Sequence, residues 1–265
     1  MKKVFSSVYT GLCFAFLYVP IIVLIVFSFN TSKGSTWTGF TFKWYAELIR
    51  NEEIISSFIN TLIVALFASV FATILGTTAA FGIHNMKKFS KNTLRTLTYI
   101  QILNPEIVTG ISLRILFAYF KMSSGFVTLI LAHITFCVPT VVLSVLPKLR
   151  QMNISLYEAA MDLGCNHFQA FIKVVIPEIM PGIISGFLMS LTYSIDDFVI
   201  SYFTSGTTSQ TLPVVIYSMT KKQVTPTIYA LSTIMFVGVL VVLIAYNIID
   251  IKFENQKKKE LGAKN

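Results

Sequence analysis

Charged residues are scarce in this sequence, and their scarcity excludes most soluble folds. Only 12% of the 265 residues are charged, 54% are hydrophobic, and the mean hydropathy is +0.72. An average soluble domain has about 25% charged residues. The composition therefore indicates an integral membrane protein.

Sets of residues that would support catalysis, metal binding or disulfide formation are also missing. The three cysteines, Cys13, Cys137 and Cys165, suggest no disulfide pair, and neither they nor the three scattered histidines have metal-ligand spacing. No Walker A loop, dinucleotide fingerprint or nucleophile–base–acid set occurs. We therefore expect no metal, no cofactor and no enzymatic activity, so that ATP-driven work would need a partner. The basic residues show no interleaving with aromatics that would predict binding to nucleic acid.

Long apolar runs are abundant by contrast. A helix needs about 20 residues, at 1.5 Å per residue, to cross the roughly 30 Å of hydrocarbon in a bilayer. Six windows satisfy this requirement: 8–29, 58–81, 97–120, 126–146, 183–203 and 228–249. The predicted fold class is an all-α polytopic membrane protein, with six transmembrane helices in a single domain over residues 1–265. We read the first run as an uncleaved span, because it is too long for a signal peptide and has no small-residue cleavage site.

Basic residues predict the orientation, because they concentrate on the cytoplasmic side of a membrane. With the N-terminus in the cytoplasm, six residues lie outside, namely Lys33, Lys43, Arg50, Lys121, Lys221 and Lys222. Fourteen lie inside: Lys2, Lys3, Lys87, Lys88, Lys91, Arg95, Lys148, Arg150, Lys173, Lys252, Lys257, Lys258, Lys259 and Lys264. We therefore expect both termini in the cytoplasm, and the net charge of +9 mainly reflects topology.

Four acidic or strongly basic residues (Asp, Glu, Lys or Arg) fall within predicted spans, where each is costly unless it faces protein or water. They are Glu106, Arg114, Asp196 and Asp197. Helical spacing aligns Asp197 with a polar stripe made of Ser190, Tyr193, Ser194 and Ser201, which predicts the lining of a path for a cation. Pairing of Arg114 with one of the acids is the structural alternative; it stays open for Asp196, whereas the path is favoured for Asp197.

Pro105 should interrupt the third span just before Glu106, because proline removes a helical hydrogen bond. A broken helix at a polar position can mark the passage of a substrate. It can equally be a packing kink, so Glu106 is the weaker prediction for the path.

A polar hairpin of two short helices is predicted at about 150–180, between the fourth and fifth spans. Ser155 and Glu158 have the spacing of a capping box, and Gly164 is placed to end the first helix in a left-handed turn. Asn166 with Gln169 repeats the start signal, and Pro177 and Pro181 should close the second helix.

This hairpin resembles the Glu-Ala-Ala loop of ABC importer permeases, which forms the coupling helix that docks into the ATPase subunit. Its pattern is Glu-Ala-Ala, three residues, Gly, nine residues, then a short apolar run ending in Pro. Val174 and Ile176 are conservative departures from the usual end. The resemblance implies that the ATPase-coupling residues are Glu158, Ala159, Ala160, Asp162, Gly164 and Pro177.

Further segments are similar to the spermidine/putrescine permeases of the PotC type, over nearly the whole chain: 42–45, 104–108, 132–139, 196–201 and 212–219. The resemblance implies a six-span, MetI-like permease in a bacterial plasma membrane. Its partners would be a sister permease, two ABC ATPase subunits, an extracytoplasmic polyamine-binding protein and membrane lipid. It implies a function in polyamine import driven by ATP hydrolysis in the partner subunits. The substrate path predicted from the charged and polar residues of the spans comprises Glu106, Tyr193, Ser190, Ser194, Asp196 and Asp197.

Two alternatives remain at this point. An ABC permease of the same build could carry another cargo, such as an amino acid, iron or a phosphonate. A secondary transporter or channel could use Glu106 and Asp197 for ion coupling, although the hairpin argues against this and inverted repeats are not evident.

Overall fold

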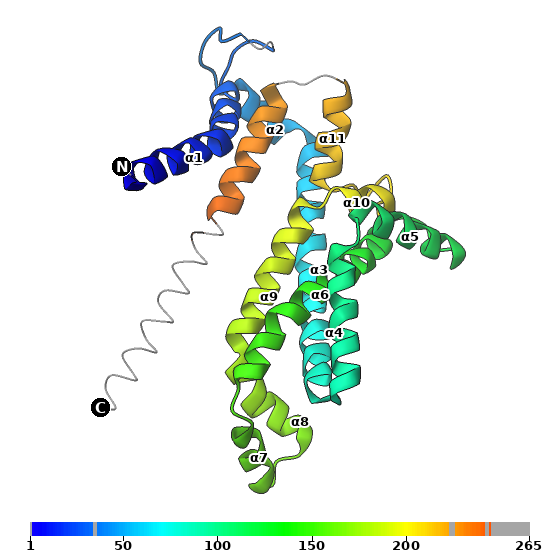
Figure 1. Cartoon of the computed structure of the whole chain (residues 1–265). Coiled ribbons are helices and arrows are strands. Elements are labelled where there is room, and N and C mark those ends of the chain that lie inside the picture. Colours follow the sequence, from blue (N-terminus) through cyan, green and yellow to red (C-terminus); the bar gives the residue numbers. More distant parts are fainter. Residues whose placement is uncertain (1, 34–35, 223–225, 242–243, 245–265) are drawn as a thin grey trace. The chain divides into compact units, whose positions relative to one another are not determined.

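The computed structural model describes residues 2–33, 36–222, 226–241 and 244. Within these residues the regular structure is helical, apart from one β-bridge between Asn30 and Phe40. In chain order the helices are α1 (Lys2–Phe27), α2 (Lys43–Arg50), α3 (Glu52–Asn85), α4 (Lys88–Leu103), α5 (Glu106–Tyr119), α6 (Phe126–Gln151), α7 (Ile154–Asp162), α8 (His167–Ala170), a π-helical turn (Phe171–Val175), α9 (Ile176–Asp196), α10 (Val199–Thr204) and α11 (Leu212–Lys222), as Figure 1 shows. A further apolar helix runs over Pro226–Val241.

The chain divides into two compact units, one formed by 1–55 with 216–265 and the other by 56–215. In the first unit, the loop after α1 is fixed by buried polar contacts. Trp44 is buried and donates its indole N–H to the carbonyl of Asn30 at 2.6 Å, and the hydroxyls of Ser28 and Tyr45 are 2.6 Å apart. The second unit contains every residue that the sequence predicts for the substrate path and the coupling hairpin.

Four described helices are long and apolar enough to cross a membrane, namely Ser7–Phe27, Glu52–Asn85, Phe126–Gln151 and His167–Asp196. They contain most of the first, second and fourth predicted spans and the greater part of the fifth. A fifth crossing is possible if α4 and α5, which meet at 101°, count as one broken span. The sixth predicted span, 228–249, is helical up to Val241, and most of its remainder lies outside the described residues.

The interruption predicted at Pro105 in the third span is confirmed: Asn104 adopts an extended conformation before Pro105, and the two halves, α4 and α5, meet at 101°. One predicted span needs correction. The fifth is not continuous over 183–203: α9 ends at Asp196, and Asp197 is extended, with φ −60° and ψ 121°. The physical reason is local, because the Asp197 carboxylate accepts backbone N–H groups of the next helix and so favours a new helix start.

The core of the larger unit forms where α6 packs along α9 and α3 (Figure 1). Val141 of α6 is fully buried, and Gly76 of α3 and Gly186 of α9 both lie against it so closely that a Cβ atom would be within 3.2 Å. Small residues allow such close approach of helices in membranes, where packing rather than the hydrophobic effect drives association. This packing gives α6 a central place between the helices that form the pocket described next.

Candidate functional site

The break between α4 and α5 places an acidic side chain at a helix start. Pro105 has no N–H to donate, and the Asn104 side-chain amide instead donates to the hydroxyl of Thr109 at 2.9 Å, across the break. Glu106 lies in the first turn of α5, where the helix dipole favours a negative charge. The Glu106 side chain is exposed and not buried in the core.

The break between α9 and α10 places two further carboxylates beside each other. Asp197 accepts the backbone N–H of Ser201 at 2.7 Å and of Ile200 at 3.3 Å, and it is 9% exposed. Asp196 ends α9 and is exposed. The second helix, α10, packs against α5, where Gly110 lies in contact with Ile200. The two broken helices therefore meet at their breaks.

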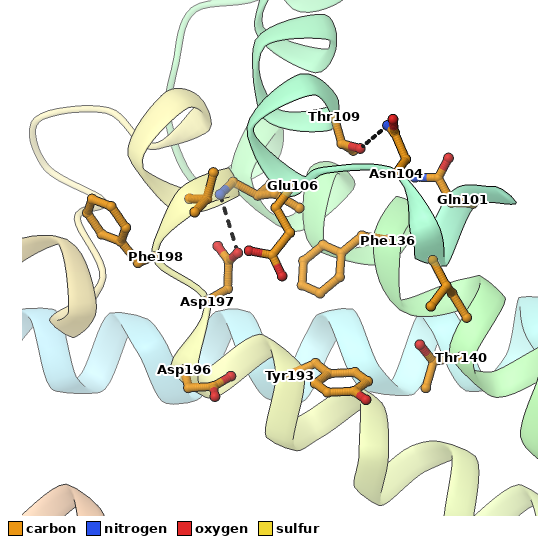
Figure 2. Close-up of a pocket in the computed structure, with 13 residues that line it drawn as sticks. Gln101, Asn104, Glu106, Thr109, Phe136, Thr140, Tyr193, Asp196, Asp197 and Phe198 are labelled. Atoms are coloured by element: carbon orange, nitrogen blue, oxygen red, sulfur yellow. Dashed lines mark hydrogen bonds between the residues drawn. The ribbon is translucent and has the colours of Figure 1, made fainter. Parts of the chain in front are cut away.

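A pocket of about 450 Å³ lies between these breaks. It is lined by Gln101, Ile102, Asn104, Glu106, Thr109, Phe136, Thr140, Tyr193, Asp196, Asp197, Phe198, Val199 and Ile200. Figure 2 shows the carboxylates of Glu106 and Asp197 directed into the same space, with Asp196 and the ring of Tyr193 at its edge. Asp196 and Asp197 are adjacent in the chain, and both line this pocket together with Glu106. None of these lining residues is basic, so the pocket concentrates negative charge.

The structure brings together only some of the residues predicted for the path. Glu106, Tyr193, Asp196 and Asp197 line the pocket, and Tyr193 is 45% exposed. Ser190 and Ser194 are buried and do not line it. The predicted polar stripe is therefore wrong as a single helical face, because the helix ends before it reaches Ser201.

Arg114 does not form the alternative pair that the sequence left open. It is exposed on α5, and in the described part of the chain no ion pair joins it to Asp196 or Asp197. The assignment of Asp196 and Asp197 to a substrate path stays a prediction, as do the roles of Glu106 and Tyr193.

His133 is the residue that sequence reasoning missed. It lies on α6 with no exposed surface, and its ring nitrogens contact Ser194 of α9 at 2.6 Å and Ser201 of α10 at 3.0 Å. Its Nε2 atom also lies 3.5 Å from the Asp197 carboxylate. A single histidine in an apolar run carries no spacing signal, and the contact with Ser201 spans 68 residues of sequence.

The predicted hairpin is present as α7 and α8, with one cap reassigned. The helix-ending signal at Gly164 is confirmed: its φ is +89°, Cys165 N–H donates to Ala160 at 3.0 Å, and Gly164 N–H donates to Met161 at 2.9 Å. This is the Schellman arrangement, which satisfies the last carbonyls of a helix. The start at Ser155 is wrong, because Asn153 caps α7 by accepting the N–H of Ser155 at 3.1 Å.

The second half of the hairpin starts as predicted but does not end as predicted. Asn166 and Gln169 form the expected reciprocal capping box, at 2.8 and 3.1 Å. Pro177 and Pro181 do not close the helix, which continues through the π-helical turn into α9. Pro177 lies in the first turn of α9, where the missing backbone N–H of proline is tolerated. The π-helical turn at Phe171–Val175 directly precedes α9, and there the hydrogen bond spans five residues instead of four.

The hairpin exposes apolar side chains at its tip and packs against α3 through aromatic side chains. Leu163 is 87% exposed and Phe168 is 69% exposed, at its tip. Of the two alanines predicted to admit a partner, Ala159 is exposed but Ala160 is buried within the fold. The hairpin is anchored by Phe81 of α3, whose ring lies 4.6 Å from that of Phe171 and 6.3 Å from that of Tyr157. It is therefore tied to the end of a spanning helix.

The family follows from a match that covers most of the chain. Residues 68–255 match the family described as binding-protein-dependent transport system inner membrane component. The chain belongs to this family. Members of the binding-protein-dependent transport family are membrane components of transport systems, in agreement with the apolar helices of the structure.

Curated relatives within this family agree with the resemblance seen in the motifs. The spermidine/putrescine transport system permease protein PotC of Escherichia coli strain K12 is 39% identical over 237 residues, which are 89% of this chain and 90% of that protein. The putrescine transport system permease protein PotI of the same strain is 38% identical over 237 residues, with 86% and 84% covered. The homologues are permease subunits of transporters rather than enzymes.

The fold is also that of a solved importer. A chain of a bacterial ABC transporter for the import of alginate superposes with a TM-score of 0.72, covering 94% of this chain and 95% of that chain. At 14% identity, this likeness establishes the shared permease fold alone.

Proposed function

We propose that this chain is a membrane-spanning permease subunit of an ABC importer for the polyamines spermidine and putrescine. The acidic pocket carries this proposal. Three carboxylates, from Glu106, Asp196 and Asp197, converge on one cavity with no lysine or arginine among the lining residues. A group of carboxylates without basic partners is unfavourable in free energy inside a membrane. A cargo with several ammonium groups would supply the missing positive charge.

Aromatic side chains support a cationic cargo in the same pocket. The rings of Phe136, Tyr193 and Phe198 lie among the carboxylates, and aromatic faces attract ammonium groups electrostatically. An anionic cargo such as a phosphonate would be repelled by the same set. The volume of about 450 Å³ is within the range of small-molecule sites.

Coupling to ATP hydrolysis is assigned to the hairpin formed by α7 and α8. Its exposed apolar tip, with Leu163 and Phe168, is typical of a protein contact surface. We propose that it docks into an ABC ATPase subunit, that Glu158, Ala159 and Asp162 lie at this contact, and that Gly164 and Pro177 set its direction. The complete transporter would contain two ATPase subunits, a sister permease and an extracytoplasmic polyamine-binding protein.

Orientation is part of the same proposal. The hairpin and both termini would face the cytoplasm of a bacterial cell, since basic residues are concentrated on that side in the predicted topology. The half-exposed Cys165 of the hairpin offers a direct probe. In a variant that lacks Cys13 and Cys137, a membrane-impermeant thiol reagent should label Cys165 only in inverted vesicles. Labelling from outside intact cells would overturn the orientation.

The cargo is tested by reconstituting the complete transporter in proteoliposomes and measuring ATP-dependent uptake of radiolabelled spermidine. We expect unlabelled putrescine to compete and a phosphonate or a neutral amino acid not to compete. Uptake that is unaffected by excess putrescine but abolished by another class of solute would reject the polyamine assignment.

A further inference from the structure

The pocket carboxylate of Asp197 is tied to a neighbouring helix through one buried side chain. Its backbone donors, Ile200 and Ser201, belong to its own segment and move with it. His133, by contrast, lies on α6 and contacts Ser194, Ser201 and Asp197 around one ring. This imidazole therefore links the Asp197 carboxylate and both sides of the α9–α10 break to α6.

The hydrogen bonds around His133 can be satisfied in one consistent order. The Nε2 atom faces the Asp197 carboxylate at 3.5 Å and the Ser201 hydroxyl at 3.0 Å. Because a carboxylate accepts hydrogen bonds, Nε2 is assigned as the protonated, donating nitrogen. The Nδ1 atom of the ring then accepts from the hydroxyl of Ser194. Both ring nitrogens therefore have a partner.

We propose that His133 is a positioning residue that holds the Asp197 carboxylate at a fixed distance from Glu106 and Asp196, and thereby sets the preference of the pocket among polyamines. The proposal rests on the proposed function. A spermidine molecule has three ammonium groups at fixed spacings along its chain, whereas putrescine has two. Displacing one of three carboxylates therefore weakens the match to spermidine more than the match to putrescine.

The position of His133 explains why it acts through Asp197 rather than on the cargo. The ring has no exposed surface and is not among the pocket-lining residues. The ring of Phe136, whose centroid lies 5.2 Å from that of His133, lines the pocket instead. A change at His133 must therefore reach the cargo through the residues it holds.

Two substitutions of His133 test the contacts of its two ring nitrogens separately. The amide of His133→Asn reaches the position of Nδ1 and keeps the bond to Ser194, but it is too short for Ser201. The amide of His133→Gln reaches the position of Nε2 and keeps the link to Ser201 and Asp197. Thr135→Val is the matched control on the same helix, because Thr135 is exposed and its hydroxyl bonds only to Leu131 of α6.

The measurement is uptake of spermidine and of putrescine by the complete reconstituted transporter, normalised to the amount of permease. We expect His133→Asn to lower the spermidine-to-putrescine uptake ratio by about fivefold, in line with the loss of one ordinary intramolecular hydrogen bond. His133→Gln should restore the ratio to within about twofold of the original, and Thr135→Val should leave it unchanged. A purely structural role for His133 would lower uptake of both polyamines equally, and that result would overturn the proposal.

A double-mutant cycle then tests whether His133 acts through Asp197. The effects of His133→Asn and Asp197→Asn on spermidine uptake should be non-additive, whereas those of His133→Asn and Glu106→Gln should add. Additivity with Asp197→Asn rejects the positioning role while leaving the polyamine pocket intact. If Asp197→Asn alone leaves uptake unchanged, the pocket itself is rejected. Should His133→Asn fail to assemble, Ser201→Ala removes the hydroxyl that contacts Nε2 of His133 and keeps the backbone N–H bond to Asp197, so it must lower the ratio in the same direction, or the proposal is rejected.

Discussion

The hairpin and the acidic pocket both depend on a break between two helices, but the breaks are stabilised differently. At Gly164 the backbone satisfies itself, through the Schellman hydrogen bonds of Gly164 and Cys165. At Asp197 the break depends on side chains, including His133 from a different helix. The first break therefore needs no side chain from another helix to hold its turn. The second makes a geometry shared among helices, so that a change in α6 is felt in the pocket.

The largest expected effect comes from comparing a substitution on the exposed face of the hairpin with one on its buried face. Ala159→Trp adds bulk to an exposed position and should abolish ATP-dependent uptake while the permease still folds. Ala160→Trp adds it to a buried position, where overpacking costs about 1–3 kcal/mol and should also lower the yield of folded permease. Co-purification of the ATPase together with membrane abundance distinguishes the two variants. Normal uptake by the Ala159→Trp protein would show that this face makes no functional contact.

A smaller effect should separate the two aspartates of the pocket. Asp197→Asn keeps an oxygen that can cap α10 but removes the charge, so uptake of labelled spermidine should fall about tenfold, the equivalent of one charge-assisted hydrogen bond. Asp196→Asn, at an exposed position, should leave the membrane abundance unchanged and reduce uptake less. A loss of abundance in the Asp196 variant would indicate that this residue supports the fold instead of the path.

The smallest effect compares two possible caps of α7. Asn153→Ala removes the side chain that caps the helix and should destabilise it by about 1 kcal/mol, whereas Ser155→Ala should have almost no effect. Proteolysis of the hairpin in the purified transporter measures the difference, since a less stable helix is cleaved faster. Equal cleavage of both variants would mean that α7 is held by its packing and not by its cap.

The same contrast decides how much could be predicted from the sequence. Gly164, Asn166 and Gln169 act within a few residues of chain, so their roles were readable from spacing. Even there, the predicted N-cap of α7 is wrong: Ser155 is expected from the sequence, but Asn153 caps the helix. Both residue types have a similar capping preference, and the two stand only two positions apart. The helical class and the interruption at Pro105 were also predictable, because apolar run length and proline chemistry are local properties.

The pocket was only partly predictable because its geometry is not local. The sequence singled out Glu106, Asp196 and Asp197 as charges in apolar surroundings, but it placed Ser190 and Ser194 on the same path. The alignment of both serines with Asp197 and Ser201 on one helical face does not hold, because α9 ends at Asp196. The restart of the helix depends on carboxylate bonds to Ile200 and Ser201, and the place of His133 depends on a contact with distant residues.

The π-helical turn at Phe171–Val175 has a consequence for the direction in which the hairpin faces. Its hydrogen bond runs from Ile176 back to Phe171, so the turn contains one residue more than an α-helical turn would. One residue of an α-helix corresponds to about 100° of rotation and 1.5 Å of rise. The number of residues in this segment therefore sets the rotation of the hairpin about the axis of α9. Deleting one residue here should rotate the hairpin about the axis of α9 by about 100°. Cross-linking from Cys165 to the proposed ABC ATPase subunit would detect the rotation as a change in the residues that cross-link.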